Sequence, residues 1–289
     1  MAQPALAVFQ ALDQALATAV ASAAPSVVYV SRGRTGGSGI AWSEDLVITS
    51  SFHTPDRTTV GIAKPDGNLD EREAEVIGRD PGTDVALLRV SGGGLTPAKF
   101  RELGNLAVGN LALAVGRPGR TARASLRAIG VFGPEVKTPW GGTLDRYIES
   151  DRQIPRGFAG GPLIDADGQI IGMNTRTLMR GTDLAIPTST LQRVVAELQA
   201  HGGIRRGYLG VGTYPVDGGA LVASVEDGGP AATAGVIVGD TIVELDGVAI
   251  TGPDSLRTAL HDRPGKAIKV AVLRGGNRQE LDVTLGAKA

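Results

Sequence analysis

Few residues in this chain could carry out chemistry, and they are widely spaced. The 289 residues include three histidines, His53, His201 and His261, and no cysteine. Zinc sites and disulfide frameworks need clustered cysteine or histidine, so the sequence predicts neither, and we expect no metal and no cofactor. The most informative segment is a glycine-rich run, residues 157–163, at whose centre Ala159 presents a methyl group. That side chain has no lone pair and cannot act as a nucleophile.

This run belongs to a series of motifs that keep one order along the chain. They are Ala24-Pro25-Ser26-Val27-Val28-Tyr29-Val30, Gly37-Ser38-Gly39, Leu46-Val47-Ile48-Thr49, Asp80-Pro81-Gly82-Thr83-Asp84-Val85-Ala86-Leu87, Ala112-Leu113-Ala114-Val115-Gly116, Gly157-Phe158-Ala159-Gly160-Gly161-Pro162-Leu163, Ile170-Ile171-Gly172-Met173-Asn174-Thr175, Leu184-Ala185-Ile186-Pro187 and Arg206-Gly207-Tyr208-Leu209-Gly210-Val211. Nine fragments in register make the chain resemble the HtrA branch of the trypsin-like serine proteases. The resemblance implies a mainly β fold, a trypsin-like double six-stranded β-barrel with its active site between the barrels, followed by a PDZ domain, a small α/β sandwich.

The resemblance also assigns catalytic positions, one at a time. The nucleophilic serine of the family corresponds to Ala159, the histidine to Phe52 and the aspartate to Asp84. In the family, the backbone N–H groups matching Gly157 and Ala159 form the oxyanion hole. His53 lies one residue past the position of the base. Adjacent residues on an extended segment project to opposite faces, so we expect its ring to point away from the site unless the backbone bulges.

Acyl transfer by this machinery needs a hydroxyl, an imidazole that deprotonates it and a carboxylate that orients the imidazole. Phe52 and Ala159 supply neither of the first two, and Phe158 replaces the family's asparagine. We therefore expect no peptidase activity and interpret the chain as an HtrA-like pseudoprotease. The alternative is an HtrA-type serine endopeptidase in which Ala159 replaces a natural serine.

Two outcomes are open for the vacated cleft. Phe52 and Phe158 could fill it with apolar surface, which we favour, or the N–H groups of the oxyanion hole could persist as an anchor for a carbonyl or carboxylate.

Residues 208–286 resemble a PDZ domain of the bacterial type, and we place the domain at 205–286. Tyr208, Leu209, Gly210 and Val211 match its carboxylate-binding loop, whose consecutive N–H groups form an anion-binding nest. Leu260 lies on the helix that would form the other wall of the groove. The resemblance implies binding of peptides or protein C-termini by strand addition. The alternative is that this domain only packs on the barrels.

The composition fits this architecture. With 42 glycines and 16 prolines, the chain favours many short strands joined by tight turns. We expect a helical segment at 1–25, a first barrel at 26–102, and a second barrel with a C-terminal helix from about Ser189 at 103–200. The net charge of −1 gives no general attraction to nucleic acid. We interpret the four arginines between Arg117 and Arg127 as a solvated hairpin face.

The N-terminal segment lacks the basic region of a signal peptide, and its alanine-rich stretch is weakly apolar, so we predict a soluble helix rather than a transmembrane span. Its apolar residues recur every three or four positions and predict a packing stripe: Leu6, Phe9, Leu12, Leu16 and Val20. Family analogy implies a periplasmic or cell-envelope protein of protein quality control. It also implies a homo-oligomer, a trimer, with an active HtrA paralogue as an alternative partner.

Overall fold

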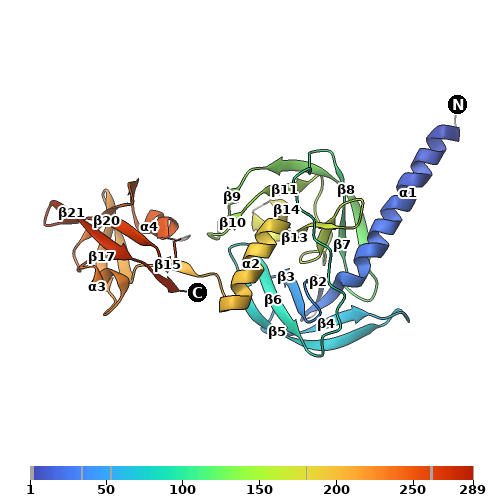
Figure 1. The fold of residues 1–289 in the computed structure, drawn as a ribbon, viewed down its shortest axis with the longest axis horizontal. Coiled ribbons are helices and arrows are strands. Elements are labelled where there is room, and N and C mark those ends of the chain that lie inside the picture. The colour runs from blue at the N-terminus through green and yellow to red at the C-terminus, as the bar shows by residue number, and fades with distance from the viewer. Residues whose placement is uncertain (1–2, 34, 53, 180, 261–262, 289) are drawn as a thin grey trace. The chain divides into compact units, whose positions relative to one another are not determined.

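A computed structural model describes residues 3–33, 35–52, 54–179, 181–260 and 263–288. The chain forms two compact units, Met1–Gly203 and Ile204–Ala289. The fold class expected from the sequence is confirmed, because two closed six-stranded barrels make up most of the first unit and a small α/β sandwich makes up the second (Figure 1).

The first barrel closes in the strand order β1-β2-β3-β6-β5-β4. Its strands are β1 (Val27–Arg32), β2 (Thr35–Ala41), β3 (Leu46–Ser50), β4 (Arg57–Ala63), β5 (Leu69–Asp80) and β6 (Val85–Val90). Every residue of β3 is buried, Thr49 and Ser50 included, as expected of a strand that is covered on both faces. This barrel presents the C-terminal end of β3 to the second barrel, where the family's base would lie.

Strand β2 has no clear strand signal in the sequence, because three of its seven residues are glycines, which weaken strands. The structure explains them by close packing. A Cβ atom on Gly36 would collide with the carbonyl of Pro118, one on Gly37 with the Arg32 side chain, and one on Gly39 with Val47. Only glycine lets this strand approach its neighbours so closely.

The second barrel has the strand order β11-β14-β13-β12-β7-β8. Its strands are β7 (Leu111–Gly116), β8 (Arg123–Gly133), β11 (Tyr147–Ser150), β12 (Pro162–Ile164), β13 (Ile170–Met179) and β14 (Thr182–Pro187), and β9 (Val136–Lys137) pairs with β10 (Thr143–Leu144) beside it. The glycine-rich run lies between β11 and β12. The two strands β11 and β12 of the closed barrel therefore determine the position of Ala159.

Helix α2 (Thr188–His201) follows β14 and packs its buried apolar residues against both barrels. It begins one residue earlier than expected, with Pro187 at the N-cap, so Ser189 lies in the first turn and no side chain caps the helix. Its end is as expected, since Gly202 takes the left-handed conformation with φ of +70°.

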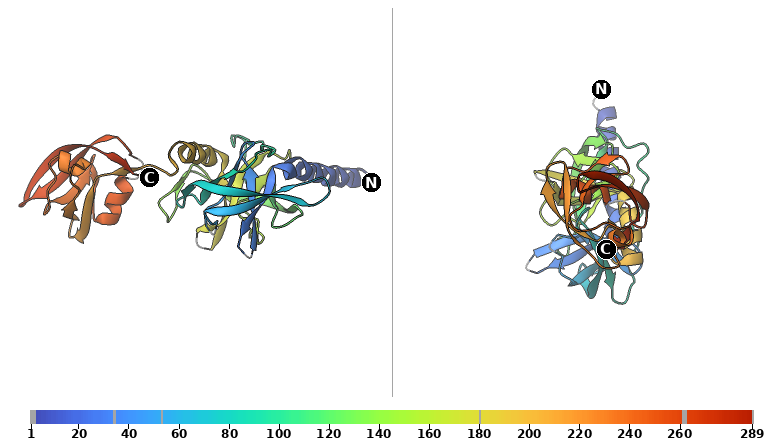
Figure 2. Two further views of the ribbon diagram at one scale, coloured as in Figure 1. Left: turned by 90° about the horizontal axis from the view of Figure 1, so that it is seen from below. Right: turned by 90° about the vertical axis from the view of Figure 1, so that its left-hand side faces the viewer.

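Helix α1 (Gln3–Ala23), which is followed by the 3-10 turn η1 (Ala24–Ser26), meets the barrels only near its C-terminal end, where Ala19 and Ala23 are buried (Figures 1 and 2). Leu6 and Phe9 of the expected stripe are 58% and 68% exposed, whereas Leu16 and Val20 are half-buried, so the body of the protein leaves the N-terminal part of the stripe uncovered. Residues Leu6–Ser26 are long and apolar enough to cross a membrane by length and composition alone, which is weak evidence because signal sequences meet the same test.

The second unit contains a six-stranded sheet in which five strands follow the order β16-β17-β18-β20-β21 and β19 pairs with β18. A separate pair is formed by β15 and β22. Its elements are β15 (Arg206–Tyr208), β16 (Val211–Val216), β17 (Gly219–Val225), α3 (Pro230–Thr233), β18 (Thr241–Leu245), β19 (Val248–Ala249), α4 (Pro253–Leu260), β20 (Ala267–Arg274), β21 (Asn277–Thr284) and β22 (Gly286–Lys288). Strand β16 is at one end of this sheet, and α4 packs beside it. One edge of β16 is thus left without a neighbouring strand among the described residues.

The turn at Gly160 yields a stability prediction. Gly160 has φ of +85°, and a Cβ atom there would lie well under 3.0 Å from the Ser38 carbonyl and the Thr49 hydroxyl of the first barrel. We expect Gly160→Ala to lower the unfolding free energy of the first unit by at least about 2 kcal/mol, since backbone strain and overpacking add. Urea unfolding followed by tryptophan fluorescence measures this, because Trp42 and Trp140 both belong to the first unit.

Gly181→Ala is the matched control. Gly181 has φ of +77°, and a Cβ atom added there would meet nothing within 4 Å, so this position carries the backbone strain without the collision and its substitution should cost only about 1 kcal/mol. Equal losses for the two variants would contradict the close approach of the barrels at Gly160.

Candidate functional site: a cleft between the two barrels

The turn that carries Ala159 forms hydrogen bonds with both barrels. Gly160 donates its N–H to the carbonyl of Asn174 at 2.8 Å, which ties the turn to β13. The carbonyl of Ala159 accepts hydrogen bonds from the Arg32 guanidinium at 3.2 Å and from the Ser38 N–H at 3.4 Å. Ala159 therefore lies at the junction of the barrels, where the sequence placed the nucleophile position.

Asp84 is the side chain of this site with the most hydrogen bonds. It is fully buried, and its backbone φ of +60° is rare for a residue other than glycine. Its carboxylate accepts hydrogen bonds from the hydroxyls of Thr175 at 2.6 Å, Ser50 at 2.8 Å and Ser51 at 3.2 Å, and from the N–H of Phe52 at 3.1 Å. Hydroxyls and one backbone N–H occupy the oxygens to which a catalytic imidazole would donate.

The electrostatics of Asp84 combine two opposed effects. Burial raises the pKa of this carboxyl above its ordinary value, because the charged form loses its hydration. The hydrogen bonds from Thr175, the Phe52 N–H and the serine hydroxyls favour the charged form and oppose that rise. Desolvation is the larger effect, as expected for a fully enclosed carboxyl that forms no ion pair with any described residue.

Phe52 lies beside Asp84 through its backbone, while its ring turns to the second barrel. Its ring centroid is 5.6 Å from that of Trp140, with the planes tilted by 59°. The structure thus brings together Asp84 and the position of the base, but the side chain there can neither accept nor donate a proton. His53, the alternative base, lies outside the described residues.

Phe158 does not fill the cleft. It is 3% exposed and belongs to the core of the second barrel, where its ring packs close to Gly116. The expectation that Phe52 and Phe158 fill the vacated site with apolar surface is therefore wrong for Phe158. The sequence could not reveal this, because a residue in a tight turn can project to either side.

The backbone donors expected for the oxyanion hole remain unused. Among the described residues, no acceptor is hydrogen-bonded to the N–H of Gly157 or of Ala159. Gly157 has φ of +82°, and its carbonyl accepts a hydrogen bond from the Ser38 hydroxyl at 2.7 Å, which holds the peptide in place. Position 159 has no side-chain hydroxyl, while two main-chain donors at the same turn have no acceptor among the described residues.

A cleft of about 660 Å³ opens at these residues. It is lined by Gly157, Ala159 and Ser50 together with three arginines, Arg32, Arg156 and Arg176. Sequence reasoning missed these arginines. A signal was present in Arg156, which directly precedes the glycine-rich run, but nothing in the sequence places Arg32 or Arg176 beside it.

The arginine run of 117–127 is only partly a solvated face. Arg117 and Arg127 are buried, and each donates to backbone carbonyls: Arg117 to Val27 at 2.7 Å and Arg127 to Gln153 at 2.8 Å. Arg120 and Arg123 are exposed, as expected. The two buried guanidinium groups thus fix loops of the barrels, so they are not available to a polyanion.

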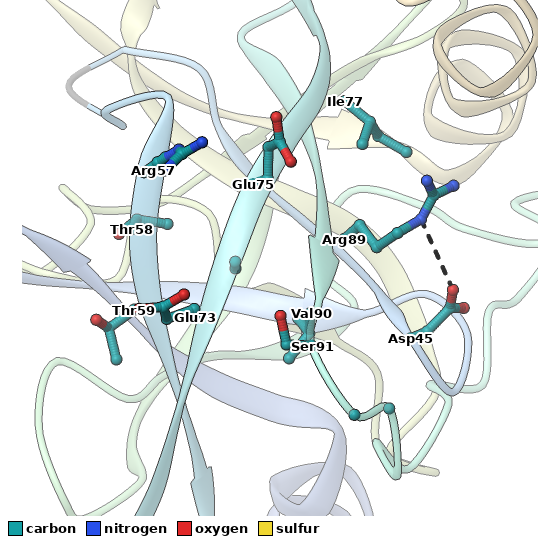
Figure 3. Close-up of a pocket in the computed structure, with 13 residues that line it drawn as sticks. Asp45, Arg57, Thr58, Thr59, Glu73, Glu75, Ile77, Arg89, Val90 and Ser91 are labelled. Atoms are coloured by element: carbon teal, nitrogen blue, oxygen red, sulfur yellow. Dashed lines mark ion pairs between the residues drawn. The ribbon is translucent and has the colours of Figure 1, made fainter.

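A second cavity of about 740 Å³ lies on the first barrel and shares no lining residue with the cleft. Figure 3 shows its charged side chains of both signs, with Arg57 and Glu75 on neighbouring strands and Arg89 paired with Asp45 at 4.0 Å. Its lining has three carboxylates, Asp45, Glu73 and Glu75, against two guanidinium groups, so this cavity does not favour an anionic ligand. Within the described residues, no group of three or more histidine, cysteine, aspartate or glutamate side chains is placed to hold a metal ion.

In the second unit, the loop that precedes β16 turns its carbonyls inward. The carbonyls of Leu209 and Gly210 accept hydrogen bonds from the N–H groups of Ala231 at 2.8 Å and Glu226 at 2.9 Å. Within the described part of the chain, the N–H groups of Leu209 and Gly210 have no acceptor, and Gly210 has φ of +80°. These are the features that an anion-binding nest requires.

The other residues expected at the peptide site have different surroundings. Leu260 is 8% exposed and belongs to the core of the unit with Leu256, so little of its surface is left to contact a peptide. The ring of Tyr208 is covered by the ammonium group of Lys288, 4.8 Å from its centroid. Val211 is half-buried at the start of the open edge strand.

Comparisons with known proteins agree with this geometry. Residues 37–173 match the trypsin-like peptidase domain, and residues 207–285 match the PDZ domain. The chain is 32% identical over 277 residues to a probable periplasmic serine endoprotease DegP-like protein of Brucella suis, covering 87% of this chain and 52% of that protein. A protein of the same description from Pseudomonas putida is 33% identical over 270 residues, covering 87% and 56%. The chain thus spans about half the length of the curated relatives it matches.

Solved structures give the same result. The HtrA-type protease AlgW with a bound decapeptide superposes with a TM-score of 0.69 and 26% identity over 95% of this chain and 99% of that chain. The serine endoprotease from Yersinia pestis superposes with a TM-score of 0.69 and 27% identity over 95% and 98%. The fold and the site therefore define a trypsin-like peptidase fold that carries a PDZ domain. Within that class, the chain is similar to the HtrA- and DegP-type serine proteases named above.

The raised pKa of Asp84 gives a pH prediction. A carboxyl whose pKa is higher in the folded state binds its proton more tightly there, so its contribution to stability falls as the pH rises above about 3.9, the unfolded value. We expect the stability of the wild type relative to Asp84→Asn to decrease between pH 4 and pH 7. Urea unfolding followed by tryptophan fluorescence at several pH values measures the slope.

Asp70→Asn serves as the control in the same barrel. A hydrogen bond from Arg72 lowers the pKa of Asp70, so its contribution is lost only as the pH falls below about 4, and no slope is expected between pH 4 and pH 7. If the wild type instead became more stable relative to Asp84→Asn as the pH rises, the hydrogen bonds to Asp84 would have a larger effect on its pKa than its burial.

Proposed function

We propose that the chain is an HtrA-like pseudoprotease, a non-catalytic binder of peptides or protein C-termini that acts as a scaffold, chaperone-like subunit or regulatory subunit. The observation that carries the proposal is the state of Asp84. Its carboxylate is saturated by Ser50, Ser51, Thr175 and the Phe52 N–H, and Ala159 stands where the family has its nucleophile. Peptide hydrolysis by this machinery needs an oxygen nucleophile and a base, and neither side chain at those two positions provides one.

The named relatives are described as proteases, and this favours one alternative, an HtrA-type endopeptidase whose serine is replaced here by Ala159. Two features support the pseudoprotease over that alternative. Phe52 occupies the position of the base, and Phe158 is integrated into the core of the second barrel, where the family's asparagine would be a buried polar group. Replacement of the nucleophilic serine alone would have changed neither position 52 nor position 158.

For partners, the proposal assigns peptide binding to the edge of β16 and the loop at residues 208–211. HtrA-type AlgW is described with a bound decapeptide, and in this chain the unpaired N–H groups of Leu209 and Gly210 provide donors for a terminal carboxylate. The uncovered apolar face of α1 supports assembly into a homo-oligomer, a trimer by family analogy, and an active paralogue is a second candidate partner. The periplasmic description of the relatives supports a periplasmic or cell-envelope location.

The first functional prediction is the absence of proteolysis. Casein should remain intact over many hours at high concentrations of the wild type and of Ala159→Ser, because the single change restores the nucleophile without its base. The matched comparison is the double variant Phe52→His, Ala159→Ser, which supplies both groups and leaves Phe158 in the core. Casein cleavage by the wild type, abolished by a serine-directed inhibitor, would overturn the proposal. Cleavage by Ala159→Ser alone would show that His53 serves as the base.

The second functional prediction concerns the loop at residues 208–211. A peptide with a free C-terminal carboxylate and a final valine should bind the full chain, and its amidated form should bind at least about tenfold more weakly, since charge-assisted hydrogen bonds contribute about 1.5–3 kcal/mol. Gly210→Val should weaken binding because valine disfavours φ of +80°. Titration calorimetry measures all three affinities.

Gly218→Val is the control for backbone strain in the same unit. Gly218 has φ of +76° with nothing within 4 Å, and it lies in the turn between β16 and β17, away from the loop. Its substitution should leave peptide affinity unchanged. Equal binding of the acid and amide peptides would rule out capture of the carboxylate and leave a packing role for this unit.

A further inference from the structure

The cleft beside Ala159 carries an excess of positive charge. Among the described residues that line it, Arg32, Arg156 and Arg176 are cationic and none is anionic. Two carboxylates interact with these arginines: Asp84, which is fully buried, acts on Arg32 through its charge, and Asp183 pairs with Arg176. The cleft thus has three guanidinium groups, and the two carboxylates that interact with them already accept hydrogen bonds from other donors.

Arg32 forms the inner part of this surface. Its guanidinium donates to the Thr49 hydroxyl and to the Ala159 carbonyl, both at 3.2 Å, which fixes its plane at the junction of the barrels. Its Nε atom is buried without a hydrogen-bond partner in the described part of the chain. Burial lowers the pKa of Arg32, and the charge of Asp84 counteracts this, so Arg32 is a desolvated cation without a direct ion pair.

Arg156 and Arg176 lie nearer the solvent. Arg156 is exposed and has no ion pair or hydrogen bond with any described residue, although it directly precedes Gly157. Arg176 is only loosely paired, with its Nε atom 3.7 Å from Asp183. Asp183 also accepts the N–H of Ile154 at 2.6 Å, which leaves much of the Arg176 guanidinium available. Both side chains can therefore contact a ligand without breaking a strong interaction within the protein.

We propose that the cleft beside Ala159 binds a carboxylate of an acidic peptide segment, with Arg32, Arg156 and Arg176 as its cationic partners and the N–H groups of Gly157 and Ala159 as additional donors. The chemistry is complementary, because guanidinium groups bind carboxylates through paired N–H donors. A volume of about 660 Å³ lies within the usual range for ligand sites. This inference rests on the proposed function in one respect, that the bound peptide is retained uncut.

Comparison with the second cavity shows that the charge of the cleft, and not its volume, indicates an anionic ligand. It is slightly larger, but Arg57 and Arg89 in its wall are offset by acidic residues of the same wall, among them Asp45 and Glu75 (Figure 3). A peptide carboxylate gains no net attraction there. Arg89 is exposed like Arg156 and so provides a matched position for a control.

The test uses peptides with acetylated N-termini and amidated C-termini, so that neither end can occupy the loop at residues 208–211. We expect an octapeptide of alternating glutamate and glycine to bind the full chain at least tenfold more tightly than the same peptide with glutamine in place of glutamate. Arg156→Gln should weaken binding of the glutamate peptide at least threefold, whereas Arg89→Gln should change it less than twofold. Titration calorimetry at low ionic strength measures these affinities, and added salt should weaken the interaction.

Two further experiments are needed. The first distinguishes a C-terminal carboxylate from a glutamate side chain, and the second tests the proposed function separately from this inference. A neutral peptide with a free C-terminus should lose affinity with Gly210→Val but not with Arg156→Gln, and the glutamate peptide should show the reverse. Equal affinity for the glutamate and glutamine peptides, or equal losses with Arg156→Gln and Arg89→Gln, would overturn the inference. Mass spectrometry of the recovered glutamate peptide tests the proposed function separately, because cleavage would overturn that function even if the peptide binds.

Discussion

Burial of the Asp84 carboxylate between two barrels is the constraint on which the rest of the site depends. A buried charge must be matched by donors, and here they come from the end of β3 in the first barrel and from Thr175 on β13 in the second. The hydrogen bonds therefore join the barrels across the region where a family enzyme does its chemistry. An imidazole at position 52 is not needed to hold this junction, because Ser50 and Ser51 supply hydroxyl donors to the carboxylate.

The same logic explains why the turn at residues 157–161 keeps its shape although its central side chain is only a methyl group. Gly160 fits between Ser38 and Thr49 with no room for a Cβ atom, and the Ala159 carbonyl is held by Arg32. The geometry of the turn is thus set by glycine packing and backbone hydrogen bonds. A serine at position 159 would not be needed to form it.

The resemblance to a known family implied the two barrels and the small α/β sandwich, and the glycine and proline content agreed with short strands joined by tight turns. Sequence reasoning failed where tertiary packing decides. Strand β2 could not be located from its own residues, because its glycines are explained only by neighbours such as Arg32 and Val47, which lie elsewhere in the chain. Phe158 was expected in the cleft, but it enters the core of the second barrel. Arg32 and Arg176 were not assigned to the site because β1 and β13 are more than 130 residues apart in the chain numbering and meet only when both barrels close.

Under the proposed function, the two binding surfaces share one physical basis. Hydrolysis depends on side chains, and a single substitution can delete a nucleophile or a base. Anion recognition at residues 157–159 and 208–211 depends instead on backbone N–H groups, which are aimed by the positive φ angles of Gly157 and Gly210. Substitution at Ala159 or Phe52 removes none of these donors. A chain that has lost proteolytic chemistry can therefore retain peptide binding, and the arginines around the cleft would determine which peptides it favours.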